Sequence, residues 1–262
     1  NYDKAAFMTA AKLGSSVGVS ESTVVRFAIE LGFSGYPSLQ KSLQELIKNK
    51  LTTVQRLDLS NDYICNGYTL KGVLKADMEN IRATMEKINY STFEDVVNNI
   101  FEAKRIYIVG LRSSMALAEF LGFYLNVILQ NVKTVGYGIS DIFEEMINVG
   151  EGDLVIGIGF PRYANRTIDV LSFAQDRGAT VVALTDSIVS PLAQRADYAL
   201  IAQSNMASFV DSLVAPLSVI NALIIAVGLR QKESVSTTFN SLEEIWKEYN
   251  VYSYNHNNDD EF

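Results

Sequence analysis

The sequence predicts a small helical head followed by a three-layer α/β domain built on a five-stranded parallel sheet. Two observations support this prediction. Residues 1–58 carry apolar side chains at helical spacing. From Arg105 onward the pattern changes to short, continuous apolar runs that alternate with helical segments. Such runs are typical of parallel strands that are covered on both faces by helices.

A helix-turn-helix pattern follows the first predicted helix of the head. Gly18 permits a sharp turn, and Ser20 is a residue type that caps a helix. Val24, Ala28 and Leu31 then fall on one helical face. The predicted head helices cover Met8–Val17, Ser20–Leu31 and, after Tyr36-Pro37, Leu39–Leu51.

Short hydrogen-bonding side chains lie off this apolar face, near the start of the second helix: Ser20, Ser22, Thr23 and Arg26. Side chains of these types suit phosphate and base-edge contacts in a DNA major groove. An ordinary short amphipathic helix is the alternative, and this pattern alone does not decide between the two.

The remaining elements follow in order along the chain. Two connecting helices are predicted at Leu70–Ile88 and Phe93–Ala103. The predicted strands are 105–110, 132–136, 153–159, 180–186 and 197–202. The helices between and after them are Ser114–Leu129, Asp141–Asn148, Asn165–Arg177, a short turn capped by Ser190, and Ser208–Arg230.

The composition excludes several kinds of site. Cys65 is the only cysteine and His256 the only histidine of the 262 residues, so a disulfide framework and a Cys/His zinc site are excluded. A Ser-His-Asp or Cys-His nucleophile is unavailable for the same reason. We therefore expect no catalytic residues, no metal and no cofactor.

The distribution of charge and of apolar residues indicates which part of the chain contacts DNA and whether the chain spans a membrane. Residues 1–60 hold seven Lys and Arg against five Asp and Glu, a net charge of +2, whereas the rest holds 15 against 25, a net charge of −10. A mildly basic head suits local DNA contact. The longest apolar stretch, Leu213–Leu229, is interrupted by Pro216 and polar residues, which favours a core helix over a membrane span. No signal peptide pattern precedes the first helix, so we expect a cytoplasmic protein.

Polar side chains follow three of the predicted strands. In open parallel sheets, ligands bind beyond the carboxyl ends of the strands. The hydroxyl, phenol and guanidinium groups at these ends belong to Arg112, Ser113, Ser114, Arg162, Tyr163, Thr185 and Ser187, and they describe an anion site, most simply for phosphate. Helix capping by the serines, and an ion pair of Arg162 with Asp169 or Asp176, are the alternatives.

Two sets of motifs in this chain together resemble one family. VSESTVVRFAIELGFSGYPSLQ resembles the DNA-binding helix-turn-helix of the RpiR (MurR/RpiR) family of bacterial transcriptional regulators. IYIVGLRSSMALAEFL, GDLVIGIGFPRYANRTIDVL, VVALTDSIVSPLAQRADYAL and FVDSLVAPLSVINALIIAVGLR resemble, in the right order, the sugar isomerase (SIS) domain of that family.

The resemblance implies a fold, partners and site residues. The fold is a helix-turn-helix head and an α/β SIS domain with a flavodoxin-like αβα sandwich, divided as 1–58, linker helices 59–103, SIS domain 104–235 and a C-terminal helix and tail 236–262. The head begins at what corresponds to the family's third helix, which implies N-terminal truncation. A homodimer or tetramer would bind a palindromic operator and respond to a phosphosugar or an acidic sugar. Ser20, Ser22, Thr23 and Arg26 would face DNA, Tyr36 and Lys41 would lie near its backbone, and Ser113 and Ser114 would belong to the effector site.

One loop departs from the family pattern. SIS phosphosugar binders read Ser-x-Ser-Gly-x-Thr after the third strand, whereas this chain reads GFPRYA at 159–164 and lacks all three hydroxyls. The phosphate cradle is therefore rebuilt, or the effector is different. Arg162 is suited to hold a phosphate or a carboxylate through two hydrogen bonds.

Two other functions are weighed against the regulator. A phosphosugar isomerase with an appended helical domain needs a base, and only carboxylates such as Glu119, Glu144 or Glu145 are available. A protein-interaction module would use the α/β fold only for dimerisation. A transcriptional regulator accounts for both motif sets, and we expect this function.

Overall fold

The computed structural model describes residues 2–47, 53, 54, 56, 69–136, 141–206 and 209–253. These residues belong to two compact units. The first comprises residues 1–83, 160–163 and 204–212, and the second comprises residues 84–159, 164–203 and 213–262. The predicted boundary at residue 58 and the polar tail from residue 254 lie outside the described residues.

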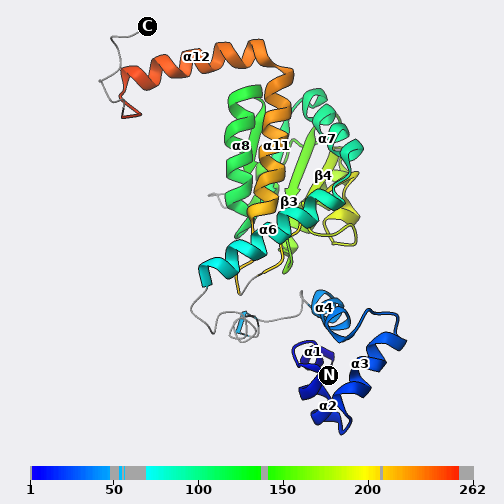
Figure 1. The fold of residues 1–262 in the computed structure, drawn as a ribbon. Coiled ribbons are helices and arrows are strands. Elements are labelled where there is room, and N and C mark those ends of the chain that lie inside the picture. The colour runs from blue at the N-terminus through cyan, green and yellow to red at the C-terminus, as the bar shows by residue number, and fades with distance from the viewer. Residues whose placement is uncertain are drawn as a thin grey trace. The chain divides into compact units, whose positions relative to one another are not determined.

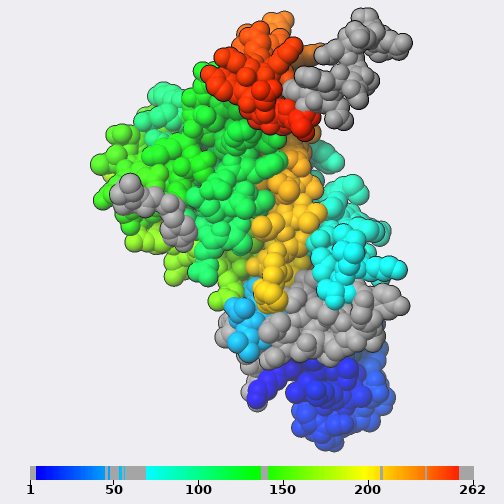
Figure 2. Space-filling model, turned by 90° about the vertical axis from the view of Figure 1, so that its left-hand side faces the viewer, coloured from blue at the N-terminus to red at the C-terminus, as the bar shows by residue number. Residues whose placement is uncertain are grey.

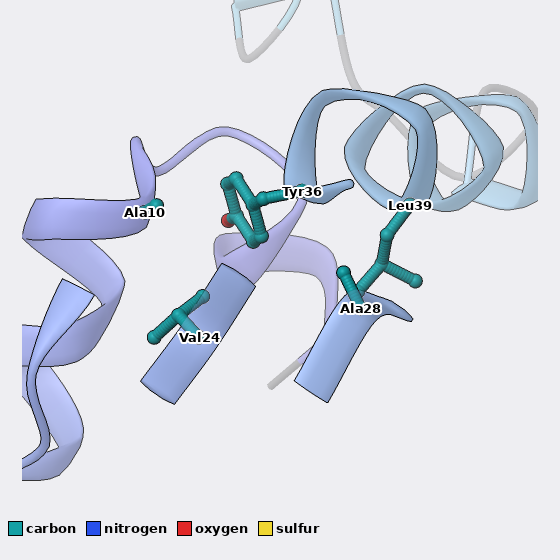
Figure 3. Close-up of a cluster of buried hydrophobic side chains, with 5 residues drawn as sticks. All are labelled: Ala10, Val24, Ala28, Tyr36 and Leu39. Atoms are coloured by element: carbon teal, nitrogen blue, oxygen red, sulfur yellow. The ribbon is translucent and has the colours of Figure 1, made fainter. Parts of the chain in front are cut away.

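The helical head contains four helices among its described residues: α1 (Tyr2–Ala5), α2 (Ala10–Val17), α3 (Glu21–Glu30) and α4 (Tyr36–Ile47). Ala10, Val24, Ala28, Tyr36 and Leu39 are buried together between α2, α3 and α4 (Figure 3). Such a small core depends on every one of these contacts, because a domain of this size buries little apolar surface.

The turn between α2 and α3 has the predicted geometry. Gly18 ends α2 in the left-handed region at φ 75°, where glycine has no steric penalty. Val19 N–H donates to the carbonyl of Gly14 over 2.9 Å. A Cβ on Gly14 would lie 2.7 Å from the carbonyl oxygen of Val19, so the two helices meet where only a hydrogen fits.

The last helix of the head starts earlier than the sequence pattern predicts. The expected start is Leu39, but α4 begins at Tyr36. Pro37 therefore occupies the first turn of the helix. An N–H is not needed for helical bonding there, and the fixed φ of proline suits the helix.

The second unit contains the predicted five-stranded parallel sheet. Its strands are β1 (Ile106–Gly110), β2 (Val132–Val135), β3 (Leu154–Ile158), β4 (Thr180–Thr185) and β5 (Tyr198–Ile201), in the order β2-β1-β3-β4-β5. Every residue of β1 and β3 is buried, which explains why these strands read as continuous apolar runs.

Helices cover both faces of the sheet. The helices are α7 (Tyr90–Glu102), α8 (Ser114–Leu129), α9 (Ile142–Glu145), α10 (Asn165–Asp176), the short 3-10 turn η1 (Ala193–Arg195) and α11 (Val214–Arg230). The helices α8 and α11 lie side by side, and α11 also contacts α7 (Figure 1). The helix α10 contacts β3 and β4, and right-handed crossovers place it on the face opposite α8.

Two helix boundaries in this unit differ from prediction. The final core helix begins at Val214 instead of Ser208, a residue outside the described ranges. A start at Ser208 would place Pro216 in the helix interior, where it lacks a donor and clashes with the preceding turn. The predicted helix Asp141–Asn148 is limited to α9, with Asp141 as its N-cap and Met146 as its C-cap.

Two further helices flank these elements. The connecting helix α6 runs from Thr69 to Lys87, and α12 (Lys232–Glu248) follows α11. No single helix among the described residues is long and apolar enough to cross a membrane. Among the described residues, α11 and the segment Val235–Glu248 of α12 pass such a test together, but a bend of 106° separates them.

Candidate DNA-binding surface and effector site

The start of α3 carries a small network of exposed hydroxyl groups. Ser20 is the N-cap, and its hydroxyl accepts the backbone N–H of Thr23 over 3.3 Å. The same oxygen lies 2.9 Å from the hydroxyl of Ser22 and 2.8 Å from that of Thr23. Helix capping therefore explains Ser20, while the three hydroxyls together form a polar surface at the positive end of the helix dipole.

Arg26 lies one turn further along α3 and is exposed. Val24 and Ala28, which flank it in sequence, are 5% and 0% exposed and hold the other face of α3 in the core. The helix is thus fixed with Ser22, Thr23 and Arg26 at the surface. Lys41 is also exposed, on α4.

Tyr36 is not available for the predicted DNA contact. It is 3% exposed, and its hydroxyl lies 2.8 Å from the carbonyl oxygen of Met8 and 3.1 Å from that of Ala5. Burial raises the pKa of the phenol, so Tyr36 stays a neutral donor. The residue joins α4 to the chain before α2, and the sequence-based assignment to the DNA surface is wrong.

The strand order changes direction between β1 and β3. In sheets of order 2-1-3-4-5 the connections leave in opposite directions at these two strands, and ligands bind beyond the carboxyl ends of such strands. Residues 111–114 follow β1 directly, and residues 159–163 follow β3. Residues 160–163 belong to the first unit, whereas residues 111–114 belong to the second.

The loop after β1 positions three of the predicted residues. Arg112 is exposed and adopts φ 60°, a left-handed conformation that is uncommon for arginine and clusters at functional sites. Ser113 is the N-cap of α8 but forms no side-chain capping bond, so capping does not explain its hydroxyl. Ser114 is 6% exposed. A Cβ on Gly110 would lie only 2.5 Å from the carbonyl oxygen of Ser114, so the glycine allows α8 to start this close to β1.

The residues after β4 are tied to local partners. Thr185 is fully buried, and its hydroxyl donates to the carboxylate of Asp186 over 3.4 Å. The hydroxyl of Ser187 accepts the N–H of Val189 over 3.3 Å. Ser190 caps the following turn by accepting from Ala193 N–H, as the sequence predicts. Ser187 is the more accessible of the two predicted site residues here.

Arg162 also has a left-handed backbone, at φ 65°, and it is exposed. Its guanidinium donates to the hydroxyl of Thr53 over 2.7 Å. No ion pair joins it to Asp169 or Asp176, both of which the structure describes, so that alternative is wrong. Phe160 is 6% exposed, and Tyr163 is partly buried.

Two of the three carboxylates considered as bases have structural partners. Glu144 accepts the N–H of Asp141 over 3.1 Å in a capping box, and Asp141 pairs with Arg166. Glu145 lies 3.6 Å from the ammonium of Lys133. Within the part of the chain that the structure describes, no group of three or more His, Cys, Asp or Glu side chains is arranged to hold a metal ion.

Sequence reasoning missed a set of polar contacts made by α6. Asn80, 1% exposed, exchanges two hydrogen bonds with the backbone of Asn205, over 2.9 and 3.1 Å. The hydroxyl of Thr84, 5% exposed, accepts the N–H of Gln203 over 2.8 Å, and the Gln203 side chain donates to the carbonyl of Asp186. The only available signal was a pair of polar residues on one helical face, which is ordinary for a surface helix.

Two family models match the chain. The model of the helix-turn-helix domain of the rpiR family matches residues 1–50, and the model of the SIS domain matches residues 99–226. The two matches cover the head with α1–α4 and the sheet with its helices.

Relatives and solved structures agree with these matches. An HTH-type transcriptional regulator of Haemophilus influenzae is 28% identical over 195 residues, which cover 72% of this chain and 66% of that protein, so the chain spans just under two thirds of it. The sugar isomerase domain of an RpiR transcription factor from Sphaerobacter thermophilus is 30% identical with a TM-score of 0.65, covering 67% of this chain and 98% of that one. The NanR protein of Vibrio vulnificus, solved in complex with ManNAc-6P, is 19% identical with a TM-score of 0.59, covering 97% of this chain and 90% of that one.

Proposed function

The chain belongs to the RpiR family of helix-turn-helix transcriptional regulators, and from this premise we propose which surfaces it uses and what it senses. The start of α3 binds operator DNA, and the edge beyond β1 and β3 binds a phosphorylated or acidic sugar. The protein acts in the cytoplasm as a homodimer or tetramer on a palindromic operator, controls genes of sugar metabolism and catalyses no reaction.

The DNA surface rests on the exposed side chains at the start of α3. Ser22, Thr23 and Arg26 are exposed on a helix whose opposite face is locked in the head core. A helix N-terminus with hydroxyl groups suits a phosphate, and an arginine one turn further on suits a guanine edge. The head also has a net positive charge, whereas the rest of the chain is net negative. We infer that α3 is the recognition helix.

Replacing Arg26 with alanine should weaken operator binding by roughly 1–3 kcal/mol if the guanidinium reads a base. Fluorescence anisotropy with an operator fragment selected from genomic DNA measures the affinity at several salt concentrations. Arg195→Ala, an exposed arginine of η1 in the second unit, is the matched control and should bind like the wild type. Equal affinity of Arg26→Ala and wild type would refute the role of Arg26.

The effector-binding proposal rests on Arg112 and Ser113 after β1 in the second unit and, separately, on Arg162 after β3 in the first unit. Ser113 has a hydroxyl that caps nothing, at the N-terminus of a 16-residue helix and at the strand pair where such sheets bind ligands. Arg112 and Arg162 follow β1 and β3 in conformations that cost energy unless the surroundings require them. The similar fold of NanR, solved with ManNAc-6P, supports a sugar phosphate as the first class of ligand to test.

A thermal-shift titration tests this site with sugar phosphates, their unphosphorylated parents and acidic sugars. A ligand at 100 times its dissociation constant adds about 2.7 kcal/mol to the free energy of unfolding. Wild type should be stabilised by at least one anionic sugar, and both Arg162→Ala and Ser113→Ala should lose most of that shift. Arg177→Ala, on the far end of α10, is the control and should keep it. Stabilisation by parent sugars alone would contradict an anion site.

The absence of catalysis is tested with the same panel. The isomerase alternative requires a carboxylate base. Glu144 accepts the capping hydrogen bond of α9, however, and Glu145 forms an ion pair with Lys133. We expect no interconversion of aldose and ketose phosphates above the uncatalysed rate by a coupled or NMR assay. Turnover that is lost in Glu119→Gln would instead support the enzyme.

A further inference from the structure

Arg162 is held at one nitrogen of its guanidinium. The Nη1 group donates to the hydroxyl of Thr53 over 2.7 Å, and this is the one polar contact of Arg162 with the part of the chain that the structure describes. The Nε and Nη2 groups, which together bind a phosphate or a carboxylate through two hydrogen bonds, have no partner there. Arg162 can therefore bind an anion while it keeps its bond to Thr53.

A buried ion pair fixes the chain close to Thr53. Arg56, three residues further along, is 2% exposed and pairs with Asp211 over 3.0 Å. Such a pair is costly to break, because the loss of one partner leaves an uncompensated buried charge. The pair therefore holds the segment that carries Thr53 against residues 204–212, which follow β5. Thr53 itself is exposed, so its hydroxyl is presented to Arg162 from a fixed backbone.

The helix α6 is bonded to the same stretch of chain. Asp77 accepts a hydrogen bond from Ser212 over 2.6 Å, and Asn80 exchanges two bonds with the backbone of Asn205. The helix is drawn in cyan at the surface of the space-filling view (Figure 2). Residues 160–163 and 204–212 belong to the same unit as the head and as α6 up to residue 83. An event at Arg162 therefore acts within the unit that contains α3.

We propose that Thr53 is a positioning residue for Arg162 and that an anion bound by Arg162 in turn holds Thr53 in place. An exposed arginine loses rotamer entropy when it binds a ligand. The bond to Thr53 orders the side chain in advance, so the anion binds more tightly. Because such coupling is reciprocal, the bound anion strengthens the attachment of the segment around Thr53 by the same factor.

This inference rests on the proposed function for the chemistry of the ligand, a phosphate or carboxylate group. It adds a residue from the chain between α4 and α6, which lies between the matches to the two family models. Competition between Thr53 and the anion for the same guanidinium nitrogens is the opposite arrangement. Removal of the Thr53 hydroxyl would then tighten anion binding, whereas positioning requires that binding weakens.

A thermal-shift titration of the full chain with inorganic phosphate, at constant ionic strength, tests the positioning role. Thr53→Val replaces the hydroxyl with a methyl group and should bind phosphate roughly fivefold more weakly than wild type, as expected for the loss of one hydrogen bond. Thr53→Ser keeps the hydroxyl and should restore the wild-type affinity. Thr237→Val is the matched control and should bind like wild type, because this exposed threonine of α12 donates to Glu233 in its own helix.

Two results of this titration would overturn the proposal. One is unchanged or tighter phosphate binding by a folded Thr53→Val, which would mean that the hydroxyl does not assist Arg162. The other is a wild type that phosphate does not stabilise, because Arg162 would then bind no anion.

Hydrogen exchange tests the reciprocal effect. Phosphate should slow exchange in the wild-type peptides that contain positions 53 and 162, and Thr53→Val should lose this protection at position 53. Equal protection of wild type and Thr53→Val by phosphate would contradict the coupling. The proposed function fails separately, if wild type shows the expected phosphate binding and protection but no anionic sugar changes its affinity for operator DNA.

Discussion

Replacing Gly110 with alanine is expected to abolish the response to effector while leaving the head folded. The added Cβ would lie 2.5 Å from the carbonyl oxygen of Ser114 and 3.0 Å from the Cβ of Ala118. The first contact is with backbone, so α8 must shift at the turn that carries Ser113 and Ser114. Overpacking of this kind costs roughly 1–3 kcal/mol of stability.

Thermal-shift and DNA-binding measurements separate the two effects. We expect Gly110→Ala to melt at a lower temperature and to lose the thermal shift caused by an anionic sugar. Its affinity for operator DNA should no longer change when that sugar is added. Gly228→Ala in α11 is the control, because its Cβ would meet only Ile128 at 3.8 Å. This variant should be as stable as wild type or up to about 1 kcal/mol more stable. A Gly110→Ala protein with a normal effector shift would refute the role of the β1 loop.

Replacing Gly14 with alanine is expected to produce the opposite pattern. A Cβ at this position would lie 2.7 Å from the carbonyl oxygen of Val19 and 3.3 Å from the carbonyl carbon of Ser20. The contact would push α3 away from α2 and distort the turn that sets the angle of the recognition helix. Because the head core is small, the loss should exceed the benefit of alanine in a helix.

Operator affinity should fall by more than tenfold in Gly14→Ala, with an unchanged effector-induced thermal shift. Hydrogen exchange should accelerate in α2, α3 and α4 and stay unchanged in β1, β3 and β4. Gly228→Ala serves again as the control and should match wild type in both assays. Wild-type DNA affinity in Gly14→Ala would show that the tight α2–α3 contact does not matter for recognition.

Much of the architecture was predictable because it is encoded locally. The buried strands β1 and β3 read as apolar runs whose predicted ends lie within one residue of the observed ones. The turn at Gly18 and the cap at Ser20 follow from residue type and position. The family resemblance, which the two family models confirm, depends on several such local motifs in a fixed order.

The errors concern contacts between residues far apart in the sequence. Tyr36 was assigned to the DNA surface, but its partners lie 28 and 31 residues earlier. Arg162 donates to Thr53, 109 residues away, a partner that neighbouring residues could not suggest. Asn80 and Thr84 are ordinary helix residues in the sequence, and only the folded chain brings them to the segment after β5. Side-chain partners of this kind depend on the fold and not on local pattern.

The most direct test is an anisotropy titration of an operator fragment with wild-type protein, with and without each anionic sugar and its parent. The account predicts DNA binding that weakens steeply with salt, because phosphate contacts release counterions. It also predicts that one anionic sugar, and not its uncharged parent, changes the affinity at least fivefold, and that Arg162→Ala abolishes this change without altering DNA binding. Operator binding that no anionic sugar affects, or a response that Arg162→Ala retains in full, would contradict the account.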